Sequence, residues 1–380
     1  MFKYLFVGGH FGDNPKKSGY IQKLYNNLQA INPNGTLING GKFEELELHI
    51  NRTFVGGKAN ATIPNSFLDV IFWMPDVSND KKKLVGIIKK RCPHVILITS
   101  KNNLEEKYKF PEMVARALQV KANLFLEFTY NTDDHSERRI RTGIYDPLGN
   151  CFCRTSDVSR VAVILMGRIH QLLKFTRVGS ENHGCVSMEV EPDAPDDFYI
   201  RIKDYADVFH RCIHGANPSR LLGNASFRCE SGFPSFKKGN VFFVSRRNID
   251  KRYIKPGGFV PVRLEFYNCE PNMVVVYDGE HKPSVDTPIQ LLLYHYYHKM
   301  NYMIHSHTYI KYAPFTRDII PCGAIEEYYE IISHCPEREH SLIKINLKGH
   351  GSLVMAQDIK NLKDIDYVPR ITPEFVNGFE

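Results

Sequence analysis

The sequence predicts two domains of different fold class, an α/β domain over residues 1–178 and an α+β domain over residues 197–380. The chain has 380 residues, and one domain usually takes roughly 100–200 residues. In the first half, short apolar runs alternate with amphipathic stretches, which is typical of a Rossmann-like parallel sheet covered by helices. In the second half, strands and helices mix without strict alternation, which indicates a central, mostly antiparallel sheet flanked by helices. Residues 179–196 are polar, and we interpret them as the linker.

The elements of the first half follow from apolar runs and helical periodicity. Buried strands are expected where the runs are rich in β-branched and aromatic residues, at Tyr4–Val7, Val70–Met74, Val95–Ile98 and Leu124–Phe128. Helices are expected where apolar residues recur every three to four positions, at Gly19–Ala30, Lys82–Lys90, Pro111–Val120 and Ser159–Lys174. This order of strands and helices predicts the parallel sheet.

The second half is predicted in the same way. Helices are expected at Tyr199–His214, Thr287–Met300 and Gly323–Ser333. Strands are expected at Val241–Ser245, Val260–Phe266, Met273–Asp278, Leu342–Leu347, along the segment that enters His305–His307, and after Gly351.

Charge and composition exclude several classes of protein. The net charge is only +7, from 49 Lys and Arg against 42 Asp and Glu, and the densest basic run is Lys81–Lys83, so a nucleic-acid surface is not favoured. The longest apolar runs, such as Val161–Met166, are far shorter than the roughly 20 residues that span a bilayer. The nine cysteines are an odd number and form no CxxC pair, so we expect a reducing, cytoplasmic location.

Two histidines in the second half have the spacing of a metal site. His305 and His307 lie on a predicted strand, where residues two apart point to the same face. Two imidazoles side by side can hold one divalent metal. His350 is a candidate third ligand, because glycines on both sides allow a close backbone approach. Three protein ligands with one open position are the catalytic form of a zinc site, although a chance pair of histidines explains the spacing nearly as well.

Several separated motifs of this half resemble one family. They occur in a single order, as Gly223–Ser226, Pro283–Tyr294, Tyr302–His307, Ile320–Cys322 and Lys348–Gly351. In this order they resemble the class II aldolase/adducin family over about residues 197–365, and most of all its L-ribulose-5-phosphate 4-epimerase branch. The fuculose-phosphate aldolase branch has Glu where this chain has Asp286. The first half resembles no family that we recognise.

The resemblance implies a role for individual residues. His305, His307 and His350 would be the ligands of Zn²⁺ or another divalent transition metal. Asp286 would be the acidic residue beside the metal and could act as a base, while its position before Thr287-Pro288 also suits a helix N-cap. Substrate or phosphate binding is implied for Asn224, Ser226 and Ser284.

Two parts of the sequence depart from the pattern of the family. Arg246 and Arg247 stand where relatives have a Lys-Pro-Ser-Gly loop. They could bind a phosphate, or they could be a solvated pair. The acid of the epimerases is replaced, and either Tyr328 or Glu327 is our candidate for the proton donor.

The resemblance therefore implies a zinc-dependent lyase or epimerase. It would act on a phosphorylated sugar or a related hydroxy-carbonyl compound through a metal-stabilised enediolate, and it would assemble as a homo-oligomer, by analogy a tetramer. The alternative is a catalytically silent binding or regulatory protein on an aldolase scaffold, whose N-terminal domain binds a nucleotide or a sugar phosphate.

The first strand is followed by a glycine-rich turn that could serve such a ligand. Gly8, Gly9 and Gly12 precede Ser18-Gly19, where a helix is expected to begin. A turn of this kind can cradle a phosphate at the helix N-terminus, or it can simply be a tight connection. Loops at strand ends that could line a pocket there carry Lys16, Lys17, Ser100-Lys101 and Asp146–Asn150.

Overall fold

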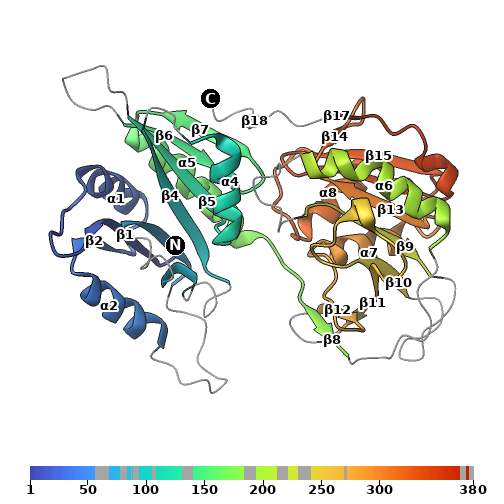
Figure 1. Ribbon diagram of the computed structural model, residues 1–380, viewed down its shortest axis with the longest axis horizontal. Coiled ribbons are helices and arrows are strands. Elements are labelled where there is room, and N and C mark those ends of the chain that lie inside the picture. The colour runs from blue at the N-terminus through green and yellow to red at the C-terminus, as the bar shows by residue number, and fades with distance from the viewer. Residues whose placement is uncertain are drawn as a thin grey trace. The chain divides into compact units, whose positions relative to one another are not determined.

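The chain folds into two compact units, each described here by itself (Figure 1). The computed structural model describes residues 1–55, 68–77, 84–86, 88, 94–104, 108–130, 140–183, 194–211, 221–229, 241–268, 272–368 and 374–375. The first unit comprises Met1–Lys174 and Thr372–Glu380, and the second comprises Phe175–Ile371. Among the described residues, no helix combines the length and the apolar character that crossing a bilayer requires.

The first unit is built on an eight-stranded mixed sheet, in the order β18-β7-β6-β5-β4-β3-β1-β2. Its strands are β1 (Tyr4–Phe11), β2 (Gly35–Gly41), β3 (Val70–Asp76), β4 (Ile96–Leu104), β5 (Leu124–Tyr130), β6 (Ile140–Tyr145), β7 (Asn150–Thr155) and β18 (Glu374–Phe375). Strands β2, β1, β3, β4 and β5 pair in parallel. A parallel sheet was predicted, but β2 was not. Strands β6 and β7 add an antiparallel hairpin that was not predicted.

Four described helices accompany this sheet. They are α1 (Gly19–Ile31), α2 (Phe43–Val55), α4 (Phe110–Gln119) and α5 (Val158–Lys174). Helix α1 begins where predicted, because the Ser18 side chain accepts a hydrogen bond from the Ile21 amide and caps the first turn. Helix α2 was not predicted. Of the helix expected at Lys82–Lys90, only residues 84–86 and 88 lie within the described residues, and they are helical.

The second unit has an eight-stranded sheet in the order β15-β16-β13-β9-β10-β11-β12-β8. Its strands are β8 (Ser180–Asn182), β9 (Asn224–Arg228), β10 (Phe242–Ser245), β11 (Phe259–Phe266), β12 (Met273–Tyr277), β13 (Tyr302–Ser306), β15 (Leu342–Leu347) and β16 (Gly351–Ala356). Only the β12–β8 pair is parallel, so the sheet is mostly antiparallel, as predicted. A separate small sheet pairs β14 (Tyr309–Ile310) with β17 (Tyr367–Val368).

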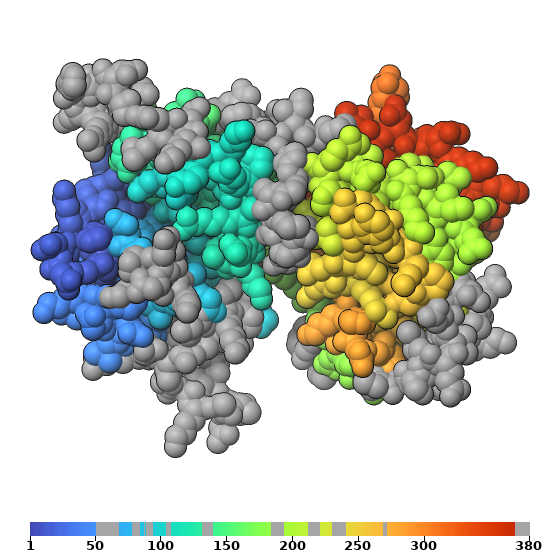
Figure 2. Space-filling model, in the orientation of Figure 1, coloured from blue at the N-terminus to red at the C-terminus, as the bar shows by residue number. Residues whose placement is uncertain are grey.

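Helices cover both faces of this second sheet. They are α6 (Asp196–Arg211), α7 (Thr287–Tyr296) and α8 (Glu326–His334), with short 3-10 helices at η2 (Lys251–Tyr253) and η3 (Ile359–Leu362). One core cluster joins α6 to Ala225, Phe227 and Ile304. A second core cluster joins α7 and α8 to Met303 and Leu353. Helix α6 also reaches the surface of this unit, in yellow-green (Figure 2).

The strand pleat assigns the site residues to one face. Because Ile304 packs toward α6 and Met303 packs toward α7 and α8, His305 points to the α7 and α8 face. The same alternation on β9 places Asn224 and Ser226 on that face, since Ala225 and Phe227 pack toward α6. Residues far apart in the sequence are therefore collected beneath α7 and α8.

The boundaries of the units differ from the predicted 1–178, 179–196 and 197–380. Residues 175–178 belong to the second unit, because the Ile325 amide donates to the Thr176 carbonyl. Ser180–Asn182, predicted as linker, form β8. The end of the chain returns to the first sheet, where Glu374 and Phe375 pair with β7. Residues 184–193 of the predicted linker lie outside the described residues.

Candidate metal centre

Three histidines from two segments converge in the second unit. The rings of His305, His307 and His350 lie 4.6–5.0 Å apart between centroids, and each residue is at most 2% exposed. One ligand nitrogen from each lies within 4.8 Å of the others, so the group could hold a metal ion. The structure thus brings together all three predicted ligands.

A glycine allows this convergence. Gly351 has φ +141°, and a Cβ at this position would lie 2.0 Å from the Ser306 carbonyl oxygen and 2.6 Å from the His307 Cα. No side chain fits at such distances, and the backbone conformation also favours glycine. The segment that carries His350 can therefore lie directly against the end of β13.

Hydrogen bonding fixes the tautomer of His305. Its Nδ1 lies 3.0 Å from the Ser352 carbonyl oxygen, which can only accept, so Nδ1 carries the proton and Nε2 carries the lone pair. Burial, together with the neighbouring His350, lowers the pKa of His305 to about 4, so the ring is neutral at pH 7. Nε2 is buried and makes no hydrogen bond within the described part of the chain. A buried lone pair of this kind fits a metal ligand.

Glu327 on α8 holds His350. Its Oε1 lies 2.7 Å from His350 Nδ1, and both side chains are buried. Burial raises the pKa of Glu327, while the interaction with His350 opposes that rise. A carboxylate on the second ring nitrogen orients a metal-binding imidazole and increases its basicity. The predicted proton donor Glu327 is therefore engaged by His350, a candidate metal ligand.

Asp286 stands at the N-cap position of α7, but its side chain makes no capping hydrogen bond. Its Oδ2 accepts from Asn224 Nδ2 at 3.0 Å and lies 3.9 Å from His305 Nε2, and its Oδ1 accepts from Cys322 Sγ at 3.1 Å. Burial acts to raise the pKa of Asp286, but His305, His350 and the Cys322 hydrogen bond outweigh it, so the pKa lies below its usual value. The carboxylate is thus ionised and directed at the histidines.

Cys322 adds a second group of potential ligands. Asp286, Cys322 and His350 each offer one ligand atom, and these atoms lie within 4.8 Å of one another. Burial first, and then the neighbouring Asp286, hold the pKa of the Cys322 thiol well above its ordinary value. The thiol therefore donates to the carboxylate, and the sequence motif alone assigned it no role.

Of the predicted substrate residues, Asn224 and Ser284 join this group, and Ser226 does not. Asn224 Nδ2 lies 3.0 Å from Ser284 Oγ, and the Gln290 side-chain amide donates to Asn224 Oδ1. Ser226 is fully buried, and its hydroxyl lies 3.1 Å from the Tyr294 hydroxyl. Ser226 lies on the same face of β9 as Asn224, but it is paired with Met303 and not with His305, so its side chain contacts Tyr294 in the core.

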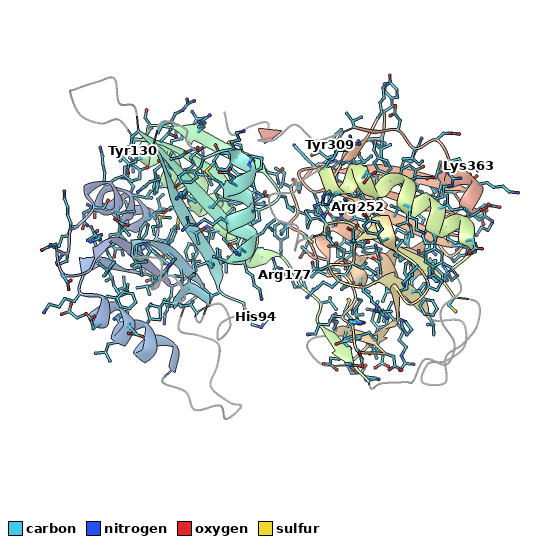
Figure 3. All side chains as sticks on the ribbon, viewed as in Figure 1. His94, Tyr130, Arg177, Arg252, Tyr309 and Lys363 are labelled. Carbon is cyan, nitrogen blue, oxygen red and sulfur yellow. The ribbon has the colours of Figure 1, made fainter. Side chains whose placement is uncertain are left out.

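A cleft of about 170 Å³ adjoins Asp286 and Cys322. Its lining includes Arg177, Arg247, Ser284 and Cys322. Figure 3 labels Arg177 on the segment that leads into β8. Arg247 is exposed and lines this cleft, so its role in binding an anion stays a prediction. The backbone of Arg246 instead forms a bridge with Pro283.

Arg177 and Lys251 were missed by the sequence analysis. Arg177 pairs in an isolated bridge with Ala324, a contact that no local pattern indicates. The Lys251 ammonium is buried and donates to the Leu221 carbonyl at 3.2 Å, which fixes the loop before Asn224. Burial lowers the pKa of Lys251 to about 8, although Asp250 and Asp286 act against it.

Tyr328, the other predicted proton donor, packs against aromatic rings. Its ring centroid lies 6.4 Å from that of Tyr296 and 5.1 Å from that of Tyr329. Its role as a proton donor stays a prediction.

Comparisons with known proteins find likenesses only among solved structures. No protein-family model matches the chain, and no curated protein matches it. A DNA/pantothenate metabolism flavoprotein from Streptococcus pneumoniae is 10% identical, covering 45% of this chain and 99% of its own, with a TM-score of 0.34. A sugar-phosphate aldolase from Thermotoga maritima is 10% identical, covering 43% and 89%, with a TM-score of 0.30. YgbL from Escherichia coli is 12% identical, covering 46% and 92%, with a TM-score of 0.28. Likenesses at this level do not assign an activity to the chain.

The Glu327–His350 contact predicts a change in metal affinity. Glu327→Gln removes the negative charge behind His350, so affinity for zinc should fall about 10–100-fold while the fold is retained. Competition with a chelating dye measures the affinity, and circular dichroism checks the fold. The matched control is Glu337→Gln, at an exposed position, which should leave the affinity within about twofold. Equal affinities of the two variants would show that Glu327 does not act through His350.

Proposed function

We propose that residues 175–371 form a zinc-dependent lyase or epimerase of the class II aldolase type. Its substrate would be a phosphorylated sugar or a related hydroxy-carbonyl compound. The observation that carries this proposal is the convergence of three buried histidines beside a buried carboxylate. The sequence resemblance supports it, because the motifs that carry these residues occur in the order of that family.

His305, His307 and His350 would hold the metal. Zinc is the metal we propose, because three imidazoles with an open position form the donor set of catalytic zinc sites, although imidazoles also suit iron and other divalent transition metals. When bound, the metal would supply a Lewis acid that stabilises negative charge developing on a substrate carbonyl oxygen.

Asp286 is the residue we propose as the general base. Its carboxylate is ionised, buried, and held by Asn224 and Cys322 on the side of His305. A base held in this way can take a proton from a substrate hydroxyl or carbon without first reorganising its surroundings. Glu327 would act as a positioning residue, because its carboxylate is engaged by His350.

Arg247 and Arg177 would bind the phosphate of the substrate. Both line the cleft beside Asp286, together with the Ser284 hydroxyl. Guanidinium groups bind phosphate through paired, charge-assisted hydrogen bonds. A phosphate held there would leave the carbonyl end of the substrate free to turn toward the histidines. Assembly as a homo-oligomer, by analogy a tetramer, belongs to the same proposal and could bring a proton donor from a neighbouring subunit.

The double variant His305→Ala/His307→Ala tests the metal and the activity together. Elemental mass spectrometry should find about one zinc per wild-type chain and close to none in the variant, because two of the three ligands are lost. Cleavage or epimerisation of ketose phosphates should be lost in parallel, with the far-UV spectrum unchanged. The control is His281→Ala/His298→Ala, at two exposed histidines. A wild-type chain that binds no zinc even when zinc is supplied would contradict the proposal.

Arg247→Ala tests the phosphate site. Loss of a charge-assisted contact of about 1.5–3 kcal/mol should raise KM for the ketose phosphate that is turned over by about 10–100-fold. The value of kcat should change far less, because Arg247 lies in the cleft and not among the histidines. Steady-state kinetics separate the two constants, and the exposed Arg338→Ala serves as the control for loss of one positive charge. An unchanged KM would remove Arg247 from the binding site.

A further inference from the structure

The first unit contains a larger cavity, of about 500 Å³. It is lined by the ends of β1, β3, β4 and β5 and by the start of α1. In this sheet β1 has β2 on one side and β3 on the other. The strand order therefore reverses next to β1, because the chain adds β2 on one side of β1 and then β3 and β4 on the opposite side. In open α/β sheets, ligands bind in the crevice outside the carboxyl ends of the strands at such a point.

The loop between β1 and α1, which lines this cavity, is closed by hydrogen bonds. The backbones of His10 and Lys16 exchange hydrogen bonds of 2.8 and 3.2 Å, which close the turn after β1. The Asn39 side chain accepts from the Ser18 amide at 2.9 Å and donates to the Ser18 carbonyl at 3.1 Å. Lys16, Lys17 and the first turn of α1 are therefore held in place before any ligand arrives.

Positive charge dominates the lining of the cavity. Among the described residues of the lining, four are basic, Lys16, Lys17, Lys101 and Arg116, and one is acidic, Asp76. Asp76 Oδ2 lies 3.2 Å from Nδ1 of His10, which also lines the cavity. An excess of cations around a concave site, next to the positive end of a helix, favours an anionic ligand.

The remaining lining is aromatic and apolar. Phe128 and Tyr130 lie at the end of β5, where Figure 3 labels Tyr130, and Met74 lies at the end of β3. The ring of Tyr20 packs edge-on against Phe128, at 5.2 Å between centroids. A bare phosphate needs no such surface, whereas a nucleobase or another planar apolar group does. The volume is also in the range of small-molecule sites, roughly 300–1,000 Å³.

We propose that this cavity binds a nucleoside phosphate. The phosphates would lie against Lys16, Lys17 and the start of α1, and the base would lie toward Phe128 and Tyr130. The inference does not rest on the function proposed for the second unit, because the described residues that line the cavity all lie between Gly9 and Ile140, in the first unit.

Two variants of the full-length chain test the proposal by different means. Lys16→Ala/Lys17→Ala removes charge at two exposed positions. Gly19→Leu changes no charge, and a Cβ at Gly19 would meet nothing within 4 Å, so α1 can accept a leucine at this lining position, where its bulk is expected to obstruct the ligand. The control is Lys23→Ala/Lys174→Ala, which removes the same charge at exposed helix positions that do not line the cavity.

Titration calorimetry with the four ribonucleoside triphosphates in magnesium buffer gives the readout, with ribose 5-phosphate and inorganic phosphate as further probes. At least one triphosphate should bind with a Kd below about 100 μM. The lysine pair should weaken binding at least about 10-fold, Gly19→Leu should abolish it, and the control should stay within about twofold. Absence of binding by every triphosphate would overturn the proposal, as would equal binding by the cavity variants and the control. Ribose 5-phosphate or phosphate binding as tightly as the best nucleotide would overturn the nucleoside part.

Discussion

The candidate metal centre depends on the close contact between Gly351 and the end of β13. A Cβ at Gly351 would lie 2.0 Å from the Ser306 carbonyl oxygen, so only glycine allows the two segments to meet. Their contact brings His350 to His305, the next-to-last residue of β13, and to His307, which lies just beyond the end of the strand where the sequence had predicted strand. Without this contact, the third imidazole would be separated from the other two, and Glu327 would have no ligand to orient.

The site also contains several buried ionisable groups. Asp286, Glu327, His305 and His350 are each at most 6% exposed. Burying such groups is costly unless each has a partner, and each of them has one: Asp286 accepts from Asn224, Glu327 pairs with His350, and His305 donates to Ser352. The histidine nitrogen that keeps a lone pair faces the centre of the cluster. The buried ionisable groups therefore surround the three histidines, where a bound divalent metal would offset the free-energy cost of burying them.

Local patterns in the sequence predicted many strands of both units and the three histidines that converge. The strands Tyr4–Val7 and Val70–Met74 were predictable because continuous apolar runs identify buried parallel strands. Strand β2 was missed because its sequence, Gly35–Gly41, is rich in glycine and has no apolar alternation. Arg177 and the role of Glu327 were missed for another reason, since each depends on a contact with a residue far along the chain. The order of the motifs pointed to the three histidines. The orientation of the Glu327 carboxylate instead depends on how α8 packs, which no local pattern in the sequence indicates.

The most direct test of the account is a crystal structure of the full-length chain with zinc, in which anomalous scattering at the zinc edge locates the metal. The account predicts one strong peak at about 2.0–2.1 Å from a nitrogen of each of His305, His307 and His350, with His305 bound through Nε2. A peak held by Asp286, Cys322 and His350 without His305 and His307, or a peak outside this cluster, would contradict it.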